Sequence, residues 1–319
     1  MMHPRLERLS VLFIALAAVL WAADAYFRAP LVTHLSAGQI VLLEDALITL
    51  ALSPWLLRRL PELRRLGARG WLAAAVIGAG PQAAATILFT ASFAYHTFAV
   101  TYVLQQTQPL IAILLAGLLL GERRRGLYWP GLVLALLGVY LVVFAPDLSA
   151  PFSALPGARV AAALLALGAA ALWALGTVLG RYLLGRVSFP TMASLRVTLA
   201  LPVLVAVVAA TQGAAGFTHY RAGDVPAFIG LALVPGIIAL PLYYRFLAVT
   251  PASLSIIAEM AFPVAATLIA SAPRPLGFGQ SLYAGQVVGT LFLMLAIVFA
   301  NWGRAHGVVE VGRPEPAAA

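Results

Sequence analysis

Residues 98–120 read FAVTYVLQQTQPLIAILLAGLLL, and residues 252–272 read ASLSIIAEMAFPVAATLIASA. Both are apolar stretches with polar residues before a proline, and an offset of 154 positions places Pro109 of the first on Pro263 of the second. Other pairs at offsets of 152 to 154 are Trp21 with Trp173, Pro81 with Pro235, and Gly131 with Gly285. A fixed offset between similar segments indicates an internal repeat, so we infer that the chain consists of two related halves.

The composition is that of a membrane protein. Hydrophobic residues make up 62% of the 319 positions, charged residues only 10%, and the mean hydropathy is +0.97. About ten apolar stretches are long enough to cross a hydrocarbon core of about 30 Å as helices. We place them at residues 10–28, 37–57, 71–94, 98–120, 128–146, 158–183, 189–211, 226–248, 252–272 and 282–302. Each half then has five spans, an odd number, so the halves insert in opposite orientations, as in many secondary transporters.

The arginines predict the orientation. The net charge is +9 and every cation is an arginine, mostly in short loops, so the charge indicates topology rather than a nucleic-acid partner. With the N-terminus inside, Arg28, Arg159, Arg221 and Arg274 are the only arginines expected outside, and Arg196 lies within a span. The sequence therefore predicts an integral protein of the cytoplasmic membrane with both termini in the cytoplasm.

The chain has no cysteine, which excludes disulfides, thiol catalysis and cysteine-ligated metals. We expect neither a metal nor a cofactor. Residues 1–9 are predicted as a cytoplasmic N-terminus, 10–146 as the first repeat, 158–302 as the second, and 303–319 as a disordered cytoplasmic tail rich in proline and alanine.

Several motifs resemble the EamA type of the drug/metabolite transporter superfamily. They are Leu20-Trp21-Ala22-Ala23-Asp24 in the first span, Pro109 followed by Gly121-Glu122, Gly131 with Gly138, and Phe262-Pro263 in the second half. Ala22, Asp24 and the segment Ala272-Pro273-Arg274-Pro275 depart from that pattern. The resemblance covers residues 10–302. It implies ten helices in two inverted five-helix repeats, with the fifth and tenth peripheral and the others around a central cavity, and mostly export of amino acids or related metabolites.

One face of the fourth span is polar. Thr101, Gln105 and Gln108 follow one another at steps of four and three, and the offset of 154 carries them onto Ser255, Glu259 and Phe262. We expect this face to line the cavity, because an unpaired polar side chain is unfavourable in hydrocarbon. The alternative is hydrogen bonding that only holds helices together.

Intramembrane charges give further candidates. Asp24, Glu44 and Asp45 belong to the predicted outer half, with Glu44 facing inward and Asp45 a candidate partner of a snorkelling Arg28. Arg196 and Glu259 are each seven residues from the start of their spans, so they share a depth. We expect an ion pair between them, direct or bridged by substrate, as an inner gate without an ionic counterpart in the outer half.

Aromatic residues and prolines complete the candidates. Phe89 and Phe93 share a face of the third span and Tyr243 is the repeat mate of Phe89, so the rings either stack on a substrate or pack helices. The paired prolines Pro81, Pro109, Pro235 and Pro263 are predicted hinges. Gly285 and Gly289 form a small-residue face that leaves the choice between a monomer and a homodimer open.

These features predict a secondary transporter in the lipid bilayer. We expect a small-molecule substrate such as an amino acid or amine, an exporter working by alternating access, and Glu259 as a site of coupling to protons. Nucleic acid is not an expected partner. A membrane-embedded enzyme is the alternative of another class, but the sequence has no zincin, nucleophile-elbow or phosphate-loop motif. A passive channel for a small polar solute is the third alternative.

Overall fold

The computed structural model describes residues 10–95, 98–105, 107–119, 128–143, 157–247, 258–259 and 261–305. In this part of the chain every regular element is helical. The first half contains α2 (Ser10–Ala22), α3 (Asp24–Leu31), α4 (Ala37–Leu57), α5 (Leu60–Leu63), α6 (Gly67–Ile77), η1 (Gly78–Ala84), α7 (Ala85–Phe93), α8 (Phe98–Gln105), α9 (Gln108–Leu119) and α10 (Tyr128–Val143). The all-α fold predicted from the sequence is confirmed.

The second half repeats this order. It contains α12 (Gly157–Leu184), α13 (Phe189–Gln212), η2 (Gly213–Phe217), η3 (Ala222–Asp224), α14 (Val225–Leu231), η4 (Ala232–Ala239), α15 (Leu240–Leu247), α17 (Ala261–Ser271) and α18 (Ala284–Ala305). Within the described residues, six continuous helical segments are long and apolar enough to span a bilayer, and the shorter apolar helices Trp129–Gly138 and Ala284–Ala296 add to them. The chain is therefore an integral membrane protein.

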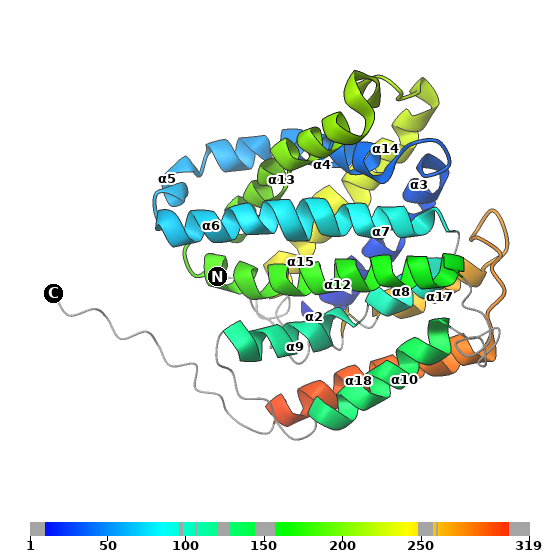
Figure 1. The fold of residues 1–319 in the computed structure, drawn as a ribbon. Helices are drawn as coiled ribbons and strands as arrows, with labels where there is room; N and C mark the ends of the chain where they lie inside the picture. The colour runs from blue at the N-terminus through cyan, green and yellow to red at the C-terminus, as the bar shows by residue number, and fades with distance from the viewer. Residues whose placement is uncertain are drawn as a thin grey trace, which may run out of the picture.

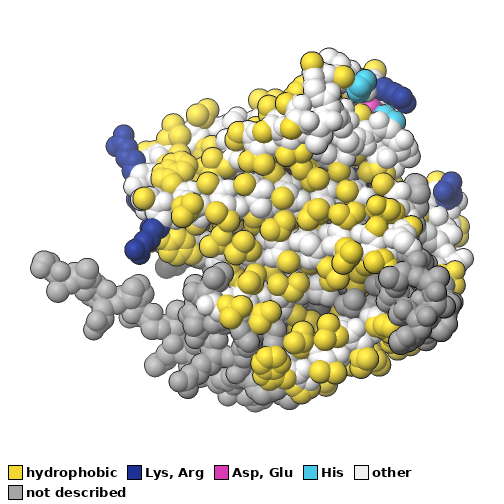
Figure 2. Space-filling model, viewed as in Figure 1, with side chains coloured by type: hydrophobic (Ala, Val, Ile, Leu, Met, Phe, Trp, Pro, Cys, Tyr) yellow, Lys and Arg dark blue, Asp and Glu magenta, His cyan; other side chains and the backbone are white. Residues whose placement is uncertain are grey.

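The surface agrees with a bilayer environment. Figure 2 shows a broad hydrophobic belt between two ends of the molecule, where the arginine side chains gather. Large apolar side chains on this belt face outward: Leu50 is 72% exposed and Leu72 is 67% exposed. Such exposure suits lipid as the solvent, because lipid-facing side chains do not need to be buried in protein.

The helices form a bundle with one peripheral pair. α4 packs along α13, α12 packs against α7, α8 and α9, and α2 packs against α15 and α17. α10 and α18 lie side by side at the edge of the bundle (Figure 1). They approach closely at Gly138, where an added Cβ would lie 2.8 Å from the carbonyl oxygen of Gly289. Gly289 thus takes part in a contact within the chain, and the choice between a monomer and a homodimer stays open.

Two prolines lie at symmetry-related π-helical turns. Pro81 is in η1 and Pro235 is in η4, each inside a long membrane helix. Proline has no N–H for the bond to the residue four positions earlier, and a wider π turn accommodates the missing bond. Gly176 of α12 allows the close approach of Pro81, because a Cβ there would lie 2.7 Å from the Pro81 Cβ.

The other two prolines lie outside the π-helical turns. Pro109 is the second residue of α9, after a turn at Thr107, and Pro263 lies in α17, where the preceding residue 260 is outside the described part of the chain. Proline is tolerated in the first turn of a helix, where its missing N–H has no intrahelical partner. Pro109 therefore stands where α9 begins, and its role as a hinge, like that of Pro263, stays a prediction.

Two clasps tie the repeats together. In the first, the Glu62 carboxylate accepts hydrogen bonds from the Ser188 backbone N–H at 2.8 Å and the Thr191 hydroxyl at 2.7 Å. In the second, the Gln39 side-chain amide donates to the carbonyl oxygen of Gly216 at 2.9 Å. Each clasp joins the start of α4 or α13 to the loop that follows its mate in the other repeat.

Candidate substrate-binding cavity

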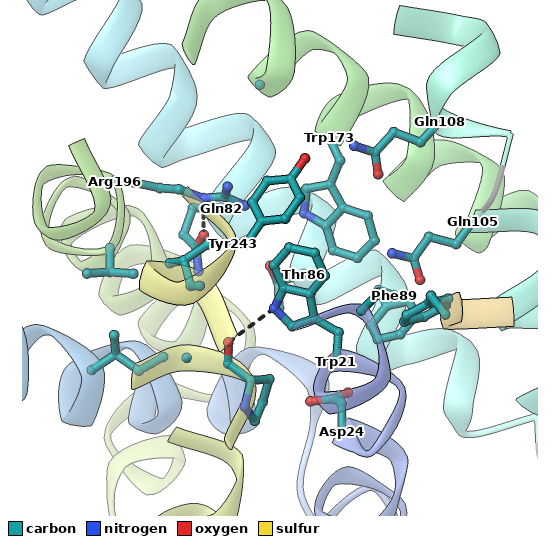
Figure 3. Close-up of a pocket in the computed structure, with 18 of the residues that line it drawn as sticks. Trp21, Asp24, Gln82, Thr86, Phe89, Gln105, Gln108, Trp173, Arg196 and Tyr243 are labelled. Carbon is teal, nitrogen blue, oxygen red and sulfur yellow. Dashed lines mark hydrogen bonds between the residues drawn. The ribbon is translucent and has the colours of Figure 1, made fainter. Parts of the chain in front are cut away.

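A cavity of about 230 Å³ is lined by side chains from both repeats (Figure 3). Its aromatic lining consists of Trp21, Phe89, Trp173, Tyr243, Tyr244 and Phe262. Its neutral polar lining consists of Gln82, Thr86, Gln105, Gln108 and Thr177, and its charged lining of Asp24, Arg28, Glu44, Arg196 and Glu259. The combination of rings with a few polar groups is typical of small-molecule sites.

The structure brings most of the predicted site residues to this cavity. Those that line it are Asp24, Glu44, Phe89, Gln105, Gln108, Arg196, Tyr243 and Glu259. Phe93 and Thr101 are fully buried outside the lining, and Phe93 packs edge-on against Phe89 and Tyr102. Their predicted contact with substrate is therefore wrong for this structure. Ser255 lies outside the described residues.

The aromatic rings are arranged symmetrically. Trp21 of α2 contacts Tyr243 of α15 with ring centroids 4.8 Å apart, and Trp173 of α12 contacts Phe89 of α7 at 5.3 Å. Trp21 and Trp173 are repeat mates, as are Phe89 and Tyr243, so each contact joins one repeat to the other. The Trp21 indole also donates a hydrogen bond to the carbonyl oxygen of Pro235 at 3.2 Å. The cavity is therefore framed by two equivalent ring pairs.

A buried ionic network closes one part of the lining. The Arg28 guanidinium donates to Asp24 at 2.7 and 2.8 Å, to Glu44 at 3.0 and 3.1 Å, and to Thr90 at 2.7 Å. Arg28 is only 2% exposed, because α3 continues to Leu31 and carries it into the protein. A guanidinium can be buried when acceptors surround it in this way. The expected snorkelling of Arg28 is wrong.

Asp45 has a different partner from the one considered. Its Oδ1 accepts a hydrogen bond from the Gln82 amide at 2.8 Å, whereas Arg28 binds Asp24 and Glu44. Adjacent residues on a helix point about 100° apart, so Glu44 and Asp45 reach different neighbours. The expectation that the predicted outer half lacks an ionic network is also wrong, because Asp24, Arg28 and Glu44 form one in that part of the chain.

Arg196 and Glu259 share the cavity without forming an ion pair. The Arg196 Nε donates a hydrogen bond to the side-chain carbonyl oxygen of Gln82. The Arg196 Nη1 is 3.5 Å from the Tyr244 hydroxyl oxygen. Glu259 accepts a hydrogen bond of 2.6 Å from the Tyr243 hydroxyl. Among the described residues, no salt bridge joins the two charges. The direct pair is therefore not formed in this structure. Each charge instead contacts one of the two neighbouring tyrosines of α15, and bridging by substrate stays a prediction.

Sequence reasoning missed several lining residues. Trp21 and Trp173 entered the sequence analysis through the repeat and, for Trp21, the first-span motif, and neither was predicted to line the site. Gln82, Thr86 and Phe89 are spaced by four and three, so they share a helical face. This polar extension of the Phe89 face could have revealed Gln82 and Thr86. Within the described residues, no cluster of three or more His, Cys, Asp or Glu side chains could hold a metal ion.

Comparisons with known proteins agree with this architecture. Residues 8–144 and 160–302 each match the model of the EamA-like transporter family. The riboflavin transporter ImpX of Fusobacterium nucleatum subsp. nucleatum is 28% identical over 298 residues, which cover 90% of this chain and 95% of that protein. A solved crystal structure with 18% identity superposes with a TM-score of 0.55, covering 93% of this chain and 99% of the other. At that identity the likeness concerns the fold alone.

Proposed function

Because the chain belongs to the EamA-like transporter family, we propose that this small-molecule transporter carries a flat, polar heteroaromatic compound of the flavin kind. The observation that supports this substrate most directly is the pair of cross-repeat ring contacts, Trp21 with Tyr243 and Trp173 with Phe89. Aromatic side chains favour flat ligands by stacking or edge contacts. The relative named as a riboflavin transporter gives independent support for the same class.

The proposed transport cycle is alternating access around this cavity. The π-helical turns that contain Pro81 and Pro235 are the natural hinges, because each lies in a helix that lines the cavity and each lacks one backbone hydrogen bond. The clasp at Glu62 and the clasp at Gln39 lie in symmetry-related places. Under the inverted topology they face opposite sides of the membrane, so opening to one side would release one clasp and keep the other.

The test measures riboflavin transport into proteoliposomes and riboflavin binding to the purified protein. Purified protein in proteoliposomes should give saturable riboflavin flux that unlabelled riboflavin inhibits, and the recovered compound should be chemically unchanged, which an embedded enzyme would not give. Trp21→Phe and Trp173→Phe should each weaken binding, because a smaller ring replaces the indole against the ligand. Trp55→Phe is the matched control, since Trp55 is on the outer surface and 42% exposed. Absence of saturable riboflavin flux in the wild type would overturn the proposal.

A proton-coupled amine or amino-acid exporter is the second candidate. Its support is the presence of Arg196 and Glu259 in one cavity without a direct bond between them, because a zwitterion could contact both. The same proteoliposomes distinguish the two candidates by competition. Inhibition by tryptophan but not by riboflavin, lost in Glu259→Gln, would favour this second candidate. Repeating flux with and without a proton gradient, in both directions, tests coupling and export and separates a carrier from a passive channel.

A further inference from the structure

We infer that Gln105 selects substrates by a lactam edge, that is, by an in-plane N–H donor next to a carbonyl acceptor on the heterocycle. The inference rests on the proposed function and deepens it by naming the chemical group of the substrate that the cavity recognises. Gln105 is the last residue of α8, and its amide points into the cavity (Figure 3). The acceptor in the inferred contact is its side-chain carbonyl oxygen, Oε1.

That oxygen is buried and accepts no hydrogen bond from any described residue. Three other side-chain oxygens share this state, on Asp45, Thr49 and Thr101, but these residues are not part of the cavity lining. A buried acceptor without a donor has lost its hydrogen bonds to water without compensation. Because the Gln105 side chain is part of the cavity lining, a bound ligand is the candidate donor for this oxygen.

The other amides of the cavity are already engaged. Gln82 donates to Asp45 and accepts from Arg196, so both ends of its amide are used. Gln108 donates to the Thr177 hydroxyl at 3.3 Å. The repeat mate of Gln105 is Glu259, whose carboxylate accepts from Tyr243 at 2.6 Å. Among these lining amides, Gln105 is the one whose carbonyl oxygen is buried without a donor. Because its repeat mate Glu259 is chemically different, the two ends of the site can orient a ligand.

A carboxamide presents its carbonyl oxygen and its NH₂ group side by side in one plane. A lactam presents the complementary N–H and carbonyl oxygen in the plane of its ring, so two parallel hydrogen bonds can form. The ring contacts around Phe89 and Trp173 hold a flat ligand in a defined plane. An ammonium group or a carboxylate matches only one half of the amide. The geometry therefore favours the imide edge of a flavin, or the corresponding edge of a pteridine or pyrimidine.

The test compares riboflavin with its N3-methyl derivative, which keeps the ring system but lacks the imide N–H. Affinities for purified wild type, Gln105→Leu, Gln105→Glu and Gln108→Leu are measured by flavin fluorescence in detergent micelles. The wild type should prefer riboflavin by tenfold or more, because a binding site built around a hydrogen bond rejects an analogue without the donor. Gln105→Leu should weaken riboflavin binding by about tenfold and bind both flavins alike.

The controls separate hydrogen bonding from size. Leucine resembles glutamine in bulk, so a steric penalty of the methyl group would persist in Gln105→Leu, whereas a hydrogen-bond penalty would disappear. Gln105→Glu keeps the acceptor and should keep the preference for riboflavin. Gln108→Leu should lower both affinities without changing their ratio. Equal binding of the two flavins to the wild type, or an unchanged preference in Gln105→Leu, would overturn the inference alone. Binding of neither flavin would overturn the proposed function together with it.

Discussion

Replacing Arg28 with methionine should destabilise the protein more than any neutralising substitution of its partners. Arg28 is 2% exposed and pairs with Asp24 at 2.7 Å and with Glu44 at 3.0 Å. The substitution keeps an unbranched side chain of similar reach but leaves two carboxylates without a counterion. The network contains two carboxylates and one guanidinium. Removing the guanidinium leaves two buried negative charges unpaired, whereas removing one carboxylate leaves none.

The expected loss follows from the contacts. Breaking a buried ion pair by removing one partner typically costs about 3–5 kcal/mol, and Arg28 serves two carboxylates, so we expect the upper part of this range. Glu44→Gln should cost less, about 1 kcal/mol or below, because it leaves Asp24 and Arg28 paired one to one. The triple variant Asp24→Asn, Arg28→Met, Glu44→Gln should recover most of the loss, since no charge is left buried.

Thermal unfolding in detergent micelles, followed by size-exclusion chromatography of the heated samples, measures these differences. A loss of several kcal/mol corresponds to a fall of many degrees in the midpoint of unfolding. The informative quantity is the coupling between sites in the mutant cycle. Losses that simply add, with the triple variant the least stable of the set, would refute the reasoning that the network exists to pair buried charge.

Three further predictions test other parts of the structure. Gly176→Ala should destabilise the protein and slow flux, because its Cβ would lie 2.7 Å from a proline carbon of η1, whereas Gly180→Ala, one turn away with its nearest contact at 3.9 Å, should be neutral or stabilising by up to about 1 kcal/mol. In the first clasp, desolvation opposes ionisation, but hydrogen bonds lower the pKa of Glu62 to about 2. The stabilisation by the ionised Glu62 should therefore be complete above about pH 4.5 and be lost as the pH falls towards 2. The difference in unfolding midpoint between wild type and Glu62→Gln should narrow over that pH range, and a constant difference would contradict the role of the Glu62 carboxylate. A cysteine introduced at Ala68 should be protected from an impermeant thiol reagent in intact cells and one at Thr218 should react, and the opposite labelling would reverse the predicted orientation.

The sequence predicted the helices well because apolar length decides them. The span predicted at residues 37–57 coincides with α4, and that at 189–211 ends one residue before α13 does. The contacts of charged side chains were harder to predict, since they depend on where a span ends and which way each side chain points. Ending the first span at residue 28 placed Arg28 at the membrane surface, but the helix continues to Leu31. An error of three residues in the predicted end of the span therefore put the Arg28 charge at the surface, whereas the structure has it in the interior.

The site shows the same limit. Arg196 and Glu259 line one cavity, in agreement with their equal depth, but depth does not give the direction of a side chain around its helix or the partners that neighbouring helices supply. Tyr243 and Tyr244 come from a neighbouring helix, and their hydroxyls bind the two charges instead. Spacing within one span can group residues on a face, as for Gln105 and Gln108, but partners on other spans require the assembled bundle.

The inverted repeat places two clasps of different chemistry at opposite ends of the bundle. Ser36 and Ser188 are repeat mates that precede α4 and α13, and inversion places equivalent positions at opposite ends of the bundle. The clasp near Ser188 depends on the carboxylate of Glu62, whereas the clasp near Ser36 depends on an amide and the backbone carbonyl of Gly216. Both are formed together in the structure, and in the proposed transport cycle access from either side breaks one of them. Because one is charged and the other neutral, acid and salt act on them unequally, and a structurally symmetric carrier thereby acquires two ends with different stability.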